Sequence, residues 1–219
     1  MGLFSFGRSK QELLAGRTAR LRKLESESTQ RQGQLEELRE LGRHLDGDRS
    51  LLVEALGVLR PGMTPKDLAA ALLELCFKPL SLASFYLALV DWEQDLIHFP
   101  LYHEGGRVRN VSWRFTGTEG LTGRALHQGR PLYFRTLEES MDGGAMLTEA
   151  EKLSGLVPPS WYGVPLGCGP EWGVRPFGLL SFQSFQKDAF SESQRNLMDA
   201  LSNILAYAMK SDPGRPIVD

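Results

Sequence analysis

The stretch EGLTGRALHQGRP, residues 119–131, contains two closely spaced glycines, a short apolar helical turn and a Gly-Arg-Pro exit. Its spacing is neither G-x-x-x-x-G-K nor G-x-G-x-x-G, so it does not indicate either common type of phosphate-binding loop. Gly120 and Gly123 instead predict a tight bend into a short helix, and Gly129 with Pro131 predicts that the chain then enters a strand. The stretch is then either an active-site lid or a structural turn over a pocket.

Apolar runs with a period of two residues lie on both sides of this stretch. Residues 84–91, 95–106 and 106–115 precede it, and residues 160–167 and 175–185 follow it, each pair separated by turn-forming residues. Such runs predict an antiparallel meander of strands. In the second run we expect His98 and Tyr102 to share one face and His103 to lie on the other, as solvent-facing or capped strand residues.

Helices are expected at both ends of this β-rich region. Thr64, followed by Pro65 and Asp67, predicts a helix start, and the apolar spacing carries that helix to about Phe77, with Cys76 on its buried face. A capping box at residues 191–194 predicts a second helix that runs to about residue 210. Between the turn stretch and the strand at 160, residues 137–159 form a long insertion with helical potential, which is typical of a functional lid or a disordered segment.

The N-terminal quarter carries a seven-residue leucine pattern. With Leu14 at position a, nine of the fourteen a and d positions between residues 14 and 59 are leucine, which predicts an interrupted coiled coil and a homodimer. Gly33, Gly42 and Gly47 favour fraying or a break near residues 45–50. The alternative is one long helix packed on its own domain. We expect a flexible tail at 1–10, a coiled-coil helix at 11–45, a globular domain at 46–210 and a C-terminal tail at 211–219.

Composition narrows the class of protein. The formal net charge of −2 gives no electrostatic reason to expect a nucleic acid partner. Two cysteines indicate no disulfide framework, and no apolar run is long enough for a membrane span, so we expect a cytoplasmic protein. The basic N-terminal tail, with Leu3, Phe4 and Phe6 beside cations, allows only a weak contact with a membrane surface.

Four blocks of sequence, in order and at characteristic spacings, together resemble the GAF domain family over residues 46–210. The resemblance implies an α+β fold with a central antiparallel sheet of about six strands and helices on both faces. It also implies that the first and last helices often form a dimer and that the other face holds any ligand pocket. The matching residues are Glu119, Gly120, Leu121, Gly123, Gly129 and Pro131, then Ser160, Val164, Pro165 and Leu166, then Gly178, Leu179 and Ser181, and finally Phe190, Ser191 and Leu197.

The resemblance leaves the ligand open. Cys76 is followed by Phe77 and Cys168 by Gly169, so the Cys-His pair of bilin-binding members is missing. The two cysteines do not fit the arrangement of methionine sulfoxide reductases, and the motif of cyclic-nucleotide binders is also missing. A distant third hypothesis is a haem-binding or redox protein, in which His98, His103 or His127 would bind the haem. We expect no cofactor, no metal and no catalytic constellation.

Two hypotheses of function remain. In the first, the protein senses a small molecule and relays binding through its helices to a separate effector protein. In the second, it is a ligand-free scaffold for dimerisation and protein interaction, whose aromatic residues only fill the core. For the sensor we expect the pocket to be lined by Phe85, Leu87, Leu89, Trp113, Phe115, Tyr133 and Trp161, with Arg124 or Arg135 available for an acidic group.

Overall fold

The computed structural model describes residues 4–114, 120–169, 172–173 and 175–210. Within its helices and strands, the side chains of residues 4–14, 19, 41, 44, 108–114 and 150 are not described. Two compact units are present, residues 1–47 and 48–219. None of the described helices is both long and apolar enough to cross a lipid bilayer.

Helix α1 (Phe4–Val58) is continuous through Gly33, Gly42 and Gly47. The break near residues 45–50 is therefore not seen. Each helix-interior glycine costs only about 1 kcal/mol relative to alanine, and the Leu, Arg, Glu and Gln residues that surround them are strong helix formers. Leucines of the seven-residue pattern, such as Leu21, Leu24, Leu35 and Leu38, are more than half exposed.

The second unit is built on a six-stranded antiparallel sheet with the order β3-β2-β1-β6-β5-β4. Its strands are β1 (Ser84–Asp91), β2 (Leu96–Glu104), β3 (Arg107–Arg114), β4 (Leu132–Phe134), β5 (Ser160–Leu166) and β6 (Gly178–Ser184). This confirms the expected α+β fold. The central strands β1, β5 and β6 are buried almost throughout because helices cover both faces.

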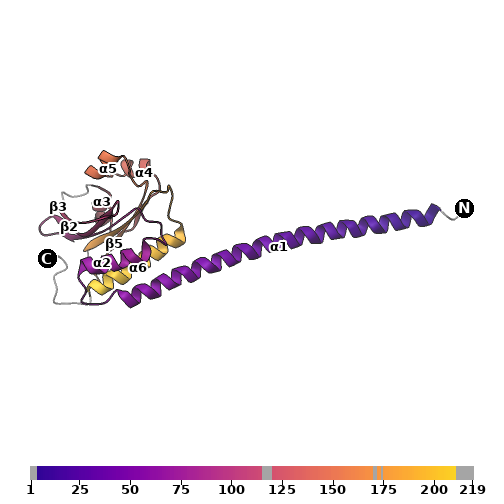
Figure 1. Ribbon diagram of the computed structural model, residues 1–219, viewed down its shortest axis with the longest axis horizontal. Coiled ribbons are helices and arrows are strands. Elements are labelled where there is room, and N and C mark those ends of the chain that lie inside the picture. The colour runs from indigo at the N-terminus through magenta and orange to yellow at the C-terminus, as the bar shows by residue number, and fades with distance from the viewer. Residues whose placement is uncertain (1–3, 115–119, 170–171, 174, 211–219) are drawn as a thin grey trace. The chain divides into compact units, whose positions relative to one another are not determined.

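One face of the sheet is covered by α2 (Pro65–Cys76) and α6 (Glu192–Lys210), which lie side by side (Figure 1). Both helix starts follow the sequence signals: the Thr64 hydroxyl accepts a hydrogen bond from the Asp67 amide, and Ser191 and Gln194 form the reciprocal bonds of a capping box. The helix-side core between these helices and the sheet includes Phe85, Leu87, Leu89, Tyr162, Phe182, Leu201 and Leu205.

The other face is covered by three short helices, α3 (Gly120–Gln128), α4 (Leu137–Asp142) and α5 (Glu149–Ser154). The insertion at 137–159 contains α4 and α5 and is ordered as a roof over this face (Figure 1). A smaller apolar cluster lies beneath it and includes Tyr86, Phe99, Tyr102, Leu121, Trp161 and Leu179. The turn stretch that begins at Gly120 thus lies beside the roof.

Candidate functional site

A cavity of about 350 Å³ lies between the sheet and the roof. Its floor comes from β1, β2, β5 and β6, and its walls come from α3, α4, α5 and the segments that join them. The volume is within the range of pockets for small ligands, about 300–1,000 Å³. The lining includes Tyr86, Phe99, Tyr102, Thr122, Ser140, Met146, Glu149, Glu151, Trp161 and Gln183.

Hydrogen bonds join the polar groups of the floor. The Tyr86 and Thr122 hydroxyls lie 2.8 Å apart, and the indole Nε1 of Trp161 donates to the Tyr86 hydroxyl at 3.2 Å. In β6, the Gln183 amide donates to the Ser181 hydroxyl at 3.3 Å. Burial is the main cause that raises the pKa of Tyr86, so this phenol stays protonated near neutral pH. The floor therefore presents neutral polar groups set among aromatic rings.

Gly163 makes room for the indole ring of Trp161. The two residues are on the same face of β5, and a Cβ atom added at Gly163 would lie 2.6 Å from Trp161 Cζ2 and Cζ3 and closer still to Cη2. Real Cβ atoms do not approach ring carbons this closely. The absence of a side chain at this position thus allows the indole to lie flat along the strand as part of the cavity floor.

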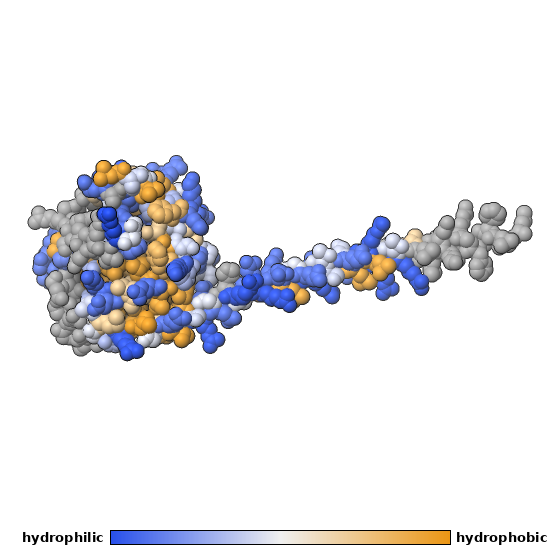
Figure 2. Space-filling view, in the orientation of Figure 1, coloured by the Kyte–Doolittle hydropathy of each residue, from blue (hydrophilic) through white to orange (hydrophobic). Residues whose placement is uncertain are grey.

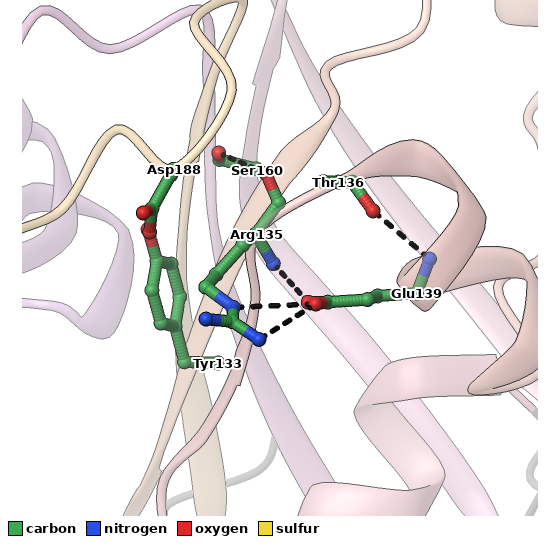
Figure 3. Close-up of polar contacts among 6 residues, drawn as sticks. All are labelled: Tyr133, Arg135, Thr136, Glu139, Ser160 and Asp188. Atoms are coloured by element: carbon green, nitrogen blue, oxygen red, sulfur yellow. Dashed lines mark hydrogen bonds and ion pairs between the residues drawn. The ribbon is translucent and has the colours of Figure 1, made fainter.

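A clamp around Arg135 holds the start of the roof, as Figure 3 shows. The Arg135 guanidinium donates to Glu139 through Nε and Nη2 at 3.2 and 3.0 Å, and the Arg135 amide donates to the same carboxylate at 2.8 Å. These bonds hold the pKa of Glu139 below its usual value, and the bond from the Arg135 backbone amide contributes most. The Thr136 hydroxyl caps α4, and the Ser160 hydroxyl donates to the Arg135 carbonyl, which ties the clamp to β5.

The rest of the roof is held by polar contacts with the sheet side and with α3. Thr148 and Glu151 form a capping box at the start of α5, and the Thr148 hydroxyl donates to Glu104 of β2 at 2.9 Å. The Arg124 guanidinium donates to the Gly143 carbonyl at the end of α4 at 3.2 Å. Among the described buried polar atoms, the Ser140 hydroxyl oxygen in the cavity wall has no hydrogen-bond partner. A buried hydroxyl without a partner is rare in a folded protein.

The structure brings only part of the predicted pocket set to this cavity. Trp161 lines it, whereas Phe85, Leu87 and Leu89 lie in the helix-side core on the opposite face of the sheet. Their neighbour Tyr86 lines the cavity instead. A strand that is buried on both faces has no polar and apolar alternation, so its sequence does not indicate which face points to a ligand, and an error of one residue inverts the assignment.

The remaining candidates are placed elsewhere. Tyr133 lies toward α6, where its hydroxyl donates to Asp188 and accepts from the Phe190 amide. Arg124 and Arg135 bind groups of the roof rather than line the cavity. Trp113 belongs to β3, but its side chain is outside the description, and Phe115 lies outside the described residues.

The turn residues have structural positions. Gly120 begins α3 with a φ of +70° and lines the cavity, and Gly129 ends the helix with a φ of +59°, two conformations that favour glycine. Gly123 is buried within α3, Pro131 leads into β4, and Pro165 is buried in β5 opposite Leu179. Glu119 lies outside the described residues.

Several lining residues were missed by the sequence reasoning. Gln183 of β6 is one of them. It and Ser181 alternate with Leu180 and Phe182, so polar groups recur on one face of a fully buried strand. That alternation was a signal for a polar cavity. Nothing in the sequence indicated Ser140, because its burial depends on how the roof folds over the sheet.

Neither cysteine lines the cavity. Cys76 is buried on the helix side, where burial raises the pKa of its thiol to about 12, and Cys168 is exposed in the loop after β5, with its pKa also raised by partial burial. A thiol with a raised pKa is a poor nucleophile near neutral pH. Among the described residues, no three His, Cys, Asp or Glu side chains are grouped so that they could hold a metal ion.

Comparison with known families and structures gives one consistent match. The sequence model of the GAF domain family matches residues 62–210. The GAF domain of a phosphoenolpyruvate-protein phosphotransferase from Acinetobacter is 17% identical, with a TM-score of 0.59 over 81% of this chain and 98% of that one. A free methionine-R-sulfoxide reductase from Neisseria meningitidis, solved with its substrate, is also 17% identical, with a TM-score of 0.61 over 76% and 90%.

The GAF domain of a second phosphoenolpyruvate-protein phosphotransferase, from Coxiella burnetii, is 13% identical, with a TM-score of 0.62 over 75% of this chain and 93% of that one. At these identities the likeness establishes the fold alone. Curated proteins offer no match to the chain.

Proposed function

The chain belongs to the GAF domain family through residues 62–210, and on that premise we propose that it is a non-enzymatic regulatory protein that binds a small molecule in the roofed cavity. The observation that carries the proposal is the cavity itself, with the buried Ser140 hydroxyl unpaired in its wall. Its volume and its few polar groups in a largely apolar lining are typical of pockets for small ligands. Binding would be relayed through the helices to an effector protein.

The positions of the two cysteines support a non-enzymatic role. A reductase that used thiol chemistry on a bound substrate would need a reactive sulfur in contact with that substrate. Cys76 and Cys168 lie outside the lining, and both have raised pKa values. Reductases are among the fold neighbours, but no cysteine is found among the described residues that line the cavity of this chain.

The test of ligand binding compares three proteins. Native mass spectrometry of the full chain, purified from its own host, is expected to show a bound species of fixed mass, which the Ser140→Leu protein loses because the larger side chain fills the cavity. Ser140→Ala removes the hydroxyl without filling space, so this matched control is expected to keep the bound species. A bare protein in all three samples, with no thermal shift across a metabolite panel, would contradict the proposal.

A second candidate function, a dimerisation scaffold, is favoured by the surface of α1. Apolar residues form separate patches along a largely hydrophilic helix (Figure 2). Leu21, Leu24, Leu35 and Leu38 are between 52% and 64% exposed, which suits the seam of a parallel coiled coil with a second copy of the chain. If no ligand binds, dimerisation through this seam is the function that we propose instead.

A further inference from the structure

The floor of the cavity is rich in aromatic rings. Tyr86 and Tyr102 are stacked with ring centroids 5.1 Å apart and an angle of 7° between their planes, and Phe99 meets Tyr86 edge to face at 5.4 Å. Trp161 adds its indole from β5. Aromatic faces carry negative electrostatic potential and attract organic cations.

The wall opposite this floor is acidic. Glu149 and Glu151, both in the first turn of α5, line the cavity, and Glu104 lies next to them through its hydrogen bond with Thr148. No Lys, Arg or His is found among the described lining residues. The nearest basic candidates from the sequence, Arg124 and Arg135, bind Gly143 and Glu139 of the roof.

The negative charge of Glu151 in α5 affects the cavity floor at Tyr86. Burial is the largest cause of the raised pKa of Tyr86, hydrogen bonds with Thr122, Ser181 and Trp161 lower it, and the negative charge of Glu151 makes the smallest contribution, which raises it. Glu151 thus adds a small negative potential beside the aromatic rings, in the direction that favours a positive charge.

We propose that the ligand of this cavity is a small organic cation, a protonated amine or a quaternary ammonium compound with an apolar body and without an acidic group. This inference rests on the proposed function, since it names the ligand class of the same site. The cationic head group lies between the aromatic floor and the carboxylates of Glu149 and Glu151.

The test uses three probes with the same phenyl group and different charge, 2-phenylethylamine, 2-phenylethanol and 3-phenylpropanoate. Binding to the full chain is followed by the NMR signal of the Trp161 indole N–H, which is assigned from the spectrum of the Trp161→Phe protein. We expect the amine to shift this signal with an affinity about tenfold higher than that of the alcohol, and we expect the carboxylate to bind most weakly. Choline and its uncharged analogue 3,3-dimethylbutan-1-ol form a second matched pair, which tests the quaternary head group.

A pair of substitutions tests the acidic wall. Glu149→Gln with Glu151→Gln removes both charges, and Gln at the position of Glu151 can still form the capping box. Amine affinity is expected to fall about fivefold to tenfold while the affinity for the alcohol stays within about twofold. The matched control, Glu138→Gln with Glu192→Gln, removes two exposed first-turn carboxylates outside the lining and is expected to leave both affinities unchanged.

The outcomes separate this inference from the proposed function. Equal binding of the three phenyl probes, or preference for the carboxylate, would overturn the cationic class while the cavity remained a binding site. Loss of amine affinity in the control pair as large as in the Glu149 and Glu151 pair would also overturn it. If no probe shifts the Trp161 signal and native spectra show no bound species, both the inference and the proposed function are wrong.

Discussion

Replacing Gly163 by alanine is expected to push the Trp161 indole off its strand and into the cavity. The added Cβ would meet two ring carbons at 2.6 Å and a third more closely still, and the ring cannot move without weakening its 3.2 Å hydrogen bond with Tyr86. Overpacking of this kind costs about 1–3 kcal/mol. The loss of glycine freedom in the unfolded chain returns about 0.4–1 kcal/mol, since Gly163 does not have a positive φ. We expect a net loss of about 1–2 kcal/mol in the free energy of unfolding.

The assay is a double-mutant cycle, measured by urea unfolding, with Trp161→Leu as the second substitution. In the Trp161→Leu protein the ring is gone, so Gly163→Ala should be neutral or should stabilise by up to about 1 kcal/mol. The coupling between the two positions is then about 1–3 kcal/mol. If Gly163→Ala changes stability by the same amount in both backgrounds, Gly163 does not make room for the indole, and the account of the cavity floor is refuted.

Three further predictions concern pH and assembly. Burial raises the pKa of Asp199, so the contribution of this carboxyl to stability is fully present below its ordinary value of 3.8 and is lost as pH rises through the raised pKa. Urea unfolding should therefore show that wild type loses stability relative to Asp199→Asn as pH rises above about 3. The pKa of Glu139 is lowered, so the contribution of this carboxylate to stability is present above its ordinary value of 4.5 and is lost as pH falls. In thermal melts, wild type should therefore lose stability relative to Glu139→Gln between about pH 5 and 3. If the stability of the two proteins changes with pH in the same way, the role of the clamp is contradicted. Leu35→Asp with Leu38→Asp should convert a dimer to a monomer in size exclusion with light scattering, whereas Thr29→Asp with Gln30→Asp, at positions b and c away from the seam, should not. A dimer that survives in both proteins would place the interface outside this part of α1.

Much of the architecture could be predicted because it rests on local signals. The Thr64 cap, the Ser191 capping box and the glycines at 120 and 129 each fix a helix end through contacts within a few residues. Such contacts depend little on the rest of the fold. The six strands and the two helices on one face therefore lie close to where the sequence placed them.

It was harder to predict which face of the sheet each strand residue points to, and β2 shows the reason. A bulge between Phe99 and Tyr102 shifts the register, so Tyr102 lies with Phe99 in the cluster under the roof. His98 pairs with Leu89, which faces the helix-side core, so His98 and Tyr102 lie on opposite faces, contrary to the expectation that they share one. An inserted residue inverts the alternation beyond it, and Pro100, which lies at this bulge, was the signal for it, because proline within a sheet is confined to edges and bulges.

The roof was the least predictable part because long-range contacts hold it. The Glu139 carboxylate has its partners in Arg135, four residues away, but the contact of the clamp with β5 is made through Ser160. The hydrogen bond between Thr148 and Glu104 joins residues that are 44 positions apart. Pairings of this kind cannot be inferred from one sequence. The lining at Ser140, Glu149 and Glu151 follows from them, so the acidic character of the cavity could not be predicted although each carboxylate is visible in the chain.

Strand β5 connects the cavity to the helical face through two adjacent residues. Trp161 lies in the cavity floor, and Tyr162, on the opposite face, donates a hydrogen bond to Asp199 of α6 at 2.7 Å. A ligand that moves the Trp161 indole together with its strand also moves Tyr162 and its hydrogen bond with α6. A ligand changes the position of α6 only if it binds two arrangements of this strand with different affinity. A relay to a partner through α6 therefore requires that the Tyr162–Asp199 bond be made in one arrangement and altered in the other, whereas a pure scaffold requires no difference.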